Sequence, residues 1–172
     1  MTEKIFEQED QEVKELNRLT AFVIGAAIEV HRQLGPGLLE SVYEACVYSE
    51  LKSLGVQVQR QVTLPITYKG VVFEDGMRLD LLVGKLLIVE LKAVEALLPI
   101  HSAQVITYLK LSKLPAGLLL NFNVTALRQG IKRLYASNAY PGIPPLAPAM
   151  EKLKQGATAS SNAYPGIPPL AS

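Results

Sequence analysis

The stretch that decides the fold is Arg78–Ala93, with the sequence RLDLLVGKLLIVELKA. It reads as two short apolar strands joined by a glycine-lysine turn. Three ionisable residues, Asp80, Glu90 and Lys92, lie among side chains that otherwise belong in a core. Burying a charge without a partner is costly. The stretch therefore indicates either a buried ion-pair cluster or a metal site.

The register of this hairpin separates the two interpretations. Glu90 and Lys92 are two residues apart on a strand and so project to the same face. A two-residue loop would place Asp80 opposite Val89 and away from Glu90. A three-residue loop, or a bulge at Gly84, would place Asp80 opposite Glu90. The metal-site hypothesis therefore predicts an odd-length or bulged turn. Two adjacent carboxylates repel each other unless a cation lies between them, and oxygen ligands suit Mg²⁺ or Mn²⁺.

Composition allows one domain and points to no strongly charged surface. The chain has 172 residues, 49% of them hydrophobic, and a formal net charge of +1 with 19% charged residues. A strong overall field for nucleic acid or membrane is therefore absent, although a local patch is left open. The single cysteine, Cys46, cannot form an internal disulfide. We see no secretory signal and no apolar run of about 18 residues, so we expect a cytoplasmic protein.

The order of the expected elements gives an α/β fold. Helices are predicted over about 21–34, capped by Asn17 or Thr20, over about 39–54, and from about Ile100 to Leu114. Strands are predicted over 56–67, 71–73 and 116–122, with two more in the opening stretch and a strand or short helix over 125–135. This order predicts a mixed sheet of four or five strands flanked by helices. It divides the chain into an N-terminal segment (1–16), a folded domain (17–136) and a proline-rich extended tail (137–172).

Two further groups of polar side chains accompany the acidic pair. Gly37-Leu-Leu-Glu40-Ser-Val-Tyr43 places an acid and a tyrosine near the start of the second helix. After the Glu-x-Lys strand, Gln104 and Tyr108 lie one helical turn apart, with His101 three residues earlier on the same face. We expect these groups to lie near Asp80 and Glu90.

Together these motifs resemble a known family. Gly37-x-x-Glu40-x-x-Tyr43, Arg78-Leu-Asp-Leu-Leu-Val, Ile88-Val-Glu-Leu-Lys-Ala, His101-x-x-Gln-x-x-x-Tyr-Leu and Leu120-Asn-Phe occur in the order seen in the GxxExxY protein family. That family is placed in the PD-(D/E)xK nuclease-like superfamily. The resemblance covers about residues 17–135 and implies a restriction-endonuclease-like core with a mixed sheet.

The resemblance also implies roles for the polar residues. Asp80 and Glu90 would hold a divalent metal, Mg²⁺ or Mn²⁺, with Glu40 adding a direct or water-mediated carboxylate contact. Lys92 would orient or deprotonate the attacking water and stabilise charge on the phosphate. The remaining members of the set would position substrate or water from the third helix; they are Gln104, Tyr108 and His101. The implied reaction is metal-assisted hydrolysis of a phosphodiester in DNA or RNA.

The tail contains two identical copies of one peptide. SNAYPGIPPLA occurs at 137–147 and again at 161–171. Its proline density favours extended conformations, so the two copies could dock in a groove of a protein with repeated sites, such as a shell or scaffold. The expected anchors are Tyr140, Ile143, Leu146, Tyr164, Ile167 and Leu170. A linker or accidental duplication without a role is the alternative. A non-catalytic binding or adaptor module, carried as cargo through the tail, is accordingly the alternative to a nuclease.

Overall fold

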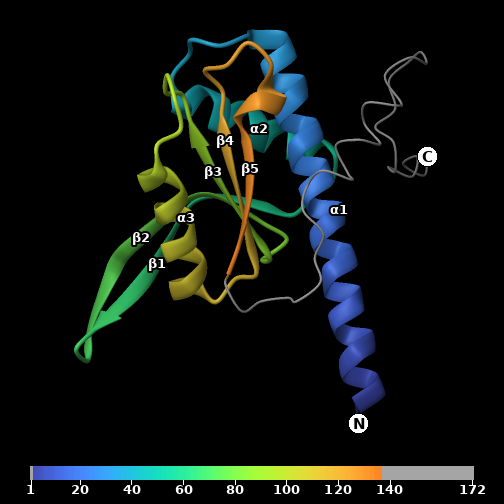
Figure 1. Ribbon diagram of the computed structural model, residues 1–172, viewed down its shortest axis with the longest axis vertical. Coiled ribbons are helices and arrows are strands. Elements are labelled where there is room, and N and C mark those ends of the chain that lie inside the picture. Colours follow the sequence, from blue (N-terminus) through green and yellow to red (C-terminus); the bar gives the residue numbers. More distant parts are fainter. Residues whose placement is uncertain (1, 137–172) are drawn as a thin grey trace. The chain divides into compact units, whose positions relative to one another are not determined.

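The computed structural model of the chain describes residues 2–136, with side chains from residue 11 onward. The expected tail anchors and the duplicated peptide lie outside the described residues. Nine elements follow one another, and Figure 1 labels them. Their bounds are α1 Thr2–Leu34, α2 Glu40–Ser53, β1 Val58–Tyr68, β2 Val71–Val83, β3 Leu87–Lys92, α3 Pro99–Ser112, β4 Ala116–Asn121, a 3-10 turn η1 Leu127–Gly130, and β5 Ile131–Tyr135.

The strands form one mixed sheet in the order β1-β2-β3-β4-β5. Only β3 and β4 are parallel, and α3 makes the crossover between them. Helix α3 packs on one face of the sheet, where Ile88, Val105, Leu109 and Leu119 share a buried cluster. Helices α1 and α2 pack together against the other face (Figure 1). The predicted α/β fold, with a mixed sheet flanked by helices, is confirmed.

The central strands are buried because both faces of the sheet are covered. Every residue of β4 is buried, and so are all residues of β3 except Lys92. This agrees with the nearly continuous apolar run that predicted a strand over 116–122. The crossover geometry brings the carboxyl end of β3 next to the start of α3. Polar residues at these two places therefore lie close to each other.

Two predicted boundaries are wrong. The first helix does not begin at Asn17 or Thr20, because α1 runs unbroken from Thr2 to Leu34. Its described part is held to the core by fully buried Leu16, while Glu15 and Arg18 form an ion pair one turn apart on the exposed side. The charged sequence at the start of the chain is therefore the beginning of a long helix.

Second, the strands predicted over 71–73 and from Arg78 are one strand, β2. Its outer half carries Glu74, Asp75 and Gly76, which read as a break in the sequence, yet it pairs with β1 as far as Val71. This half of the β1–β2 hairpin extends beyond the body of the sheet (Figure 1). All of Val71–Gly76 is exposed, so no buried face imposes an alternating apolar pattern there.

The segment over 125–135 combines both expected alternatives, a short helical turn (η1) and a strand (β5). In the part of the chain that the structure describes, no helix has the length and apolar character needed to cross a membrane.

Candidate active site

The site is organised by the fork where β2 leaves β3. The two strands pair through Val83↔Leu87, Leu82↔Ile88 and Leu81↔Val89 only. The loop between them therefore has three residues, as the metal-site hypothesis predicted. Continuing this register places Asp80 opposite Glu90, on one face of the sheet. The predicted odd-length turn is confirmed.

Gly84 makes this loop possible. Its φ angle is +59°, in the left-handed region that glycine adopts at little cost. A Cβ at this position would collide with the side chain of Leu19 on α1. The amide of Gly84 also donates to the carbonyl of Gln57, at 2.8 Å. The loop is therefore fixed by packing against α1 as well as by its own backbone.

Asp80 replaces a missing strand contact. Beyond Leu81, β2 no longer pairs with β3, and Oδ2 of Asp80 accepts a hydrogen bond from the amide of Leu91 at 2.9 Å. Burial raises the pKa of Asp80; the Leu91 amide and Lys92 oppose the rise, and Glu44 and Glu40 add to it. The carboxylate is thus held at the fork at an electrostatic cost.

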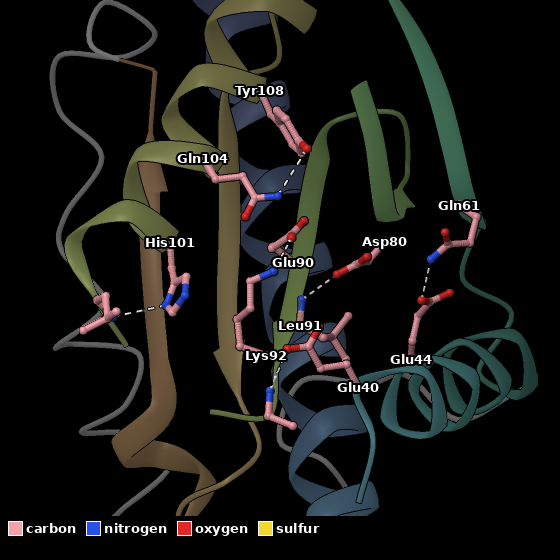
Figure 2. Close-up of polar contacts among 12 residues, drawn as sticks. Glu40, Glu44, Gln61, Asp80, Glu90, Leu91, Lys92, His101, Gln104 and Tyr108 are labelled. Carbon is pink, nitrogen blue, oxygen red and sulfur yellow. Dashed lines mark hydrogen bonds and ion pairs between the residues drawn. The ribbon is translucent and has the colours of Figure 1, made fainter. Parts of the chain in front are cut away.

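Glu90 and Lys92 form a buried ion pair, with Nζ of Lys92 2.7 Å from Oε1 of Glu90 (Figure 2). The side chain of Glu90 is only 3% exposed, and its other oxygen, Oε2, is buried without a hydrogen-bond partner. Burial, followed by the charge of Asp80, raises the pKa of Glu90 to about 7 despite the lysine. For Lys92, burial acts to lower the pKa, but the bond to Glu90 and the surrounding carboxylates outweigh it and raise the pKa. The lysine is therefore a cation at neutral pH.

Glu40 joins the set from the first turn of α2. Its Oε1 accepts a hydrogen bond from the amide of Ala93, at 3.1 Å, directly after the Glu-x-Lys strand. Its charge acts on Asp80, Glu90 and Lys92. The structure therefore brings the four residues together, as Figure 2 shows.

The three predicted site residues of α3 have two different roles in the structure: Gln104 and Tyr108 bond to each other, and His101 caps the helix. Nε2 of Gln104 donates to the hydroxyl of Tyr108 at 3.2 Å, and Figure 2 shows both side chains directed toward β3. Nδ1 of His101 instead accepts from the amide of Leu98, at 3.1 Å, and so caps the start of the helix. No contact of His101 with Glu90 or Lys92 is found among the described residues.

Two residues of the site were given no role from the sequence, although Asn121 belongs to the Leu120-Asn-Phe motif. Glu44 lies one turn after Glu40, is 5% exposed, and accepts bonds from Arg60 at 2.8 Å and Gln61 at 2.6 Å. The i, i+4 spacing from Glu40 was the available signal. Asn121, at the end of β4, holds the backbone after β3. It donates to the carbonyl of Val94 at 2.8 Å and accepts from the amide of Val94 at 3.1 Å. A polar residue ending an otherwise apolar strand was the signal for it.

A cleft of about 660 Å³ opens beside the fork, and Glu40, Glu44 and Asp80 line it. Within residues 11–136, no group of three or more acidic, histidine or cysteine side chains is arranged closely enough to hold a metal ion. The donor chemistry nevertheless fits a divalent cation. Two carboxyl groups with raised pKa face each other, and Oε2 of Glu90 has no partner. Asp80 and Glu90 are the residues that would hold the ion.

A mixed sheet whose central fork carries an Asp, a Glu-x-Lys strand and a glutamate from the preceding helix defines a restriction-endonuclease-like α/β domain. The chain belongs to the PD-(D/E)XK nuclease superfamily, whose sequence profile matches residues 17–134. Members of this superfamily typically use divalent metal ions. The matched region contains every residue of the site described above.

Other comparisons add little. No curated protein sequence matches the chain. One solved structure, described as "Crystal structure of SSO0001", is similar at 15% sequence identity with a TM-score of 0.42, covering 92% of this chain and 88% of that chain. At this TM-score the likeness supports no conclusion about fold or function.

Proposed function

We propose that the chain is a metal-dependent nuclease that hydrolyses phosphodiester bonds in DNA or RNA. The observation that carries the proposal is the placement of Asp80 opposite Glu90 at the β2–β3 fork, with Lys92 bonded to the glutamate. Within the superfamily, we further propose membership of the GxxExxY group, supported by the spacing of Gly37, Glu40 and Tyr43.

The ion, Mg²⁺ or Mn²⁺, would supply charge neutralisation at the phosphate and a more acidic water. Asp80 and Glu90 would hold it, and Glu40 would add a third carboxylate. Glu40 also accepts the hydrogen bond of the Ala93 amide and so holds the backbone after β3. The raised pKa of Lys92 favours one of its two expected roles, that of a cation stabilising negative charge on the phosphate. Glu90 would bind the ion as a carboxylate, and the charge of the ion would favour that ionised form over the protonated one.

Gln104 and Tyr108 act from α3. Their mutual hydrogen bond fixes the amide and the phenol relative to each other, and both side chains are directed toward β3 (Figure 2). We assign them to orienting the substrate or water. His101 caps the helix, and its contribution is to hold the helix start in place.

The proposal is tested by a cleavage panel of single- and double-stranded DNA and RNA, with the pure chain in Mg²⁺, in Mn²⁺ and in EDTA. Cleavage should require the ion and should be lost in Asp80→Asn and Glu90→Gln. Asp75→Asn is the matched control, because Asp75 lies on the same strand as Asp80 but is exposed on the outer hairpin. Calorimetric titration with Mn²⁺ should give weaker binding for the two site variants than for the control. Unchanged metal affinity in all variants, together with no cleavage of any substrate, would refute the nuclease proposal.

A second candidate function rests on the duplicated tail peptide. We propose that Tyr140, Ile143 and Leu146, with Tyr164, Ile167 and Leu170, dock in repeated sites of a protein shell or scaffold. The exact repetition of eleven residues at 137–147 and 161–171 supports this proposal. The chain would then act inside the cytoplasm, where its one cysteine needs no disulfide partner. Removal of 137–172 should abolish assembly with the partner and leave cleavage unchanged; co-purification of the truncated chain would contradict it.

A further inference from the structure

The cleft beside the fork has an apolar rim. Leu38 and Leu39, from the loop before α2, line it together with Glu40 and Asp80. Leu39 is 73% exposed and Leu38 is 40% exposed. Two adjacent leucines facing water at the mouth of a polar cleft cost solubility without helping the core, which is the usual sign of a binding surface.

This rim is held in place by Tyr43. Its buried hydroxyl donates to the carbonyl of Gly35 at 2.7 Å and accepts from the amide of Leu38 at 3.0 Å. The ring of Tyr43 stacks on that of Phe122, with ring centroids 4.3 Å apart. The loop that presents the leucines is thereby anchored to the sheet, and its apolar side chains are pre-positioned.

Leu39 also occupies a position that favours another residue type. It is the N-cap of α2 and makes no side-chain capping bond. Serine, threonine, aspartate and asparagine stabilise this position because their oxygen accepts a free helix amide. The helix forgoes that bond and carries an exposed leucine instead, so the leucine has a use other than the stability of α2.

The β1 and β2 strands supply two arginines to the cleft, Arg60 and Arg78. Arg78 lies two residues before Asp80 on β2 and therefore on the same face. No ion pair of Arg78 occurs among the described residues. Arg60 is fixed by Glu44 at 2.8 Å. The neighbouring residue Gln61 has a φ of +50°, an unusual backbone for a strand, and this turn of the chain lets both side chains reach Glu44.

From these walls we infer that the substrate is single-stranded nucleic acid, with one unpaired nucleotide seated in the cleft. Its base packs on Leu38 and Leu39, and a phosphate beside it pairs with Arg78 near Asp80. This inference rests on the proposed nuclease function.

A base offers an apolar face to such a wall only when it is unstacked; inside a duplex the faces are covered and only polar edges are open. The volume of about 660 Å³ is that of a pocket for a small ligand, which leaves room for a group the size of one nucleotide.

The test is equilibrium binding of fluorescent oligonucleotides to the full chain in Ca²⁺, by anisotropy, with a single strand, the same strand in a duplex, and the same strand with abasic sites. The wild type should bind the single strand at least about tenfold more tightly than the duplex. Leu39→Ser should weaken single-strand binding about tenfold, although serine at this N-cap keeps or raises the melting temperature. The matched control is Val72→Ser on the outer hairpin, since Val72 is 54% exposed; it should bind as the wild type does.

The abasic strand separates base packing from a general loss of affinity. It should bind the wild type at least as weakly as the intact strand binds Leu39→Ser, because it lacks the contacts with both leucines, and the substitution should not weaken its binding further. Arg78→Gln should weaken the intact and the abasic strands equally, because Arg78 contacts phosphate. Tighter binding of the duplex, or an equal effect of Leu39→Ser on intact and abasic strands, would overturn the inference. Cleavage is scored separately: metal-dependent cutting of duplex alone would overturn the inference and keep the nuclease, whereas selective single-strand binding without cutting would do the reverse.

Discussion

The free energy of unfolding of the wild type should fall as the pH rises through neutrality, and in Glu90→Gln it should fall much less. The folded protein raises the pKa of Glu90 from 4.5 to about 7, by burial and by the charge of Asp80. Because the folded-state pKa lies above the unfolded one, the stabilising contribution is fully present below about pH 4.5 and is lost as the pH rises through about 7. A rise of this size is worth about 3 kcal/mol when the carboxyl is fully ionised, and about 2.5 kcal/mol between about pH 5 and about pH 8.

Urea unfolding followed by circular dichroism in EDTA measures this directly. The free energy of unfolding of the wild type should fall relative to that of Glu90→Gln by about 2.5 kcal/mol between about pH 5 and about pH 8. Glu74→Gln is the control, since Glu74 is exposed on β2 and should follow the wild type. Lys92 stays protonated over this range, so it does not contribute to the difference. Mg²⁺ at the higher pH should restore stability to the wild type and not to Glu90→Gln.

The opposite result is equally specific. If wild type and Glu90→Gln differ by the same free energy at both pH values, ionisation of Glu90 costs nothing in the folded protein. The carboxylate would then be a satisfied partner of Lys92, and its unpartnered oxygen would give no reason to expect a cation. The metal site proposed at Asp80 and Glu90 would lose its electrostatic basis.

Three further predictions concern the parts that hold the site. Tyr43→Phe should lower the free energy of unfolding by about 1 to 3 kcal/mol, because it leaves the amide and carbonyl that the hydroxyl joins without partners, and urea unfolding checks this. Gly84→Ala should cost about 2 kcal/mol or more and lower the melting temperature, since it meets both a left-handed backbone and the side chain of Leu19; a stability equal to wild type would show that the loop has a different geometry. Asn121→Ala should speed hydrogen exchange at the Val94 amide and reduce Mn²⁺ affinity, whereas unchanged exchange there would contradict its role in holding the segment after β3.

The parts of the fold that follow from short periodicities could be predicted from the sequence. Alternation in steps of two placed Glu90 and Lys92 on one face, and the ten-residue separation meant that Asp80 would lie opposite Glu90 only if the loop had an odd length or a bulge. The structure has three residues there. The all-apolar strand of 116–122 likewise indicated cover on both faces, as found for β4.

Features set by exposure or by distant contacts could not be predicted in the same way. The outer half of β2 is exposed on all sides, so Glu74, Asp75 and Gly76 carried no pattern by which a strand is recognised. The role of Glu44 depends on the left-handed backbone of Gln61, and neither residue type requires that conformation. His101 shares a helix face with Gln104, but the bond that it makes to the Leu98 amide is decided by the local path of the loop before α3.

The fork described above also joins two parts of the domain mechanically. Only three residue pairs attach β2 to β3, while β1 and β2 pair from Val58↔Val83 to Tyr68↔Val71, with a register shift between Leu64 and Ile66. The hydrogen bond from the Leu91 amide to the Asp80 carboxylate is therefore the contact at which the projecting hairpin leaves the body of the sheet. A tilt of the hairpin about this point would displace Asp80 relative to Glu90, because Asp80 belongs to the β1–β2 hairpin and Glu90 belongs to β3 in the centre of the sheet. A partner that binds the outer hairpin and tilts it would therefore change the distance between the Asp80 and Glu90 carboxylates.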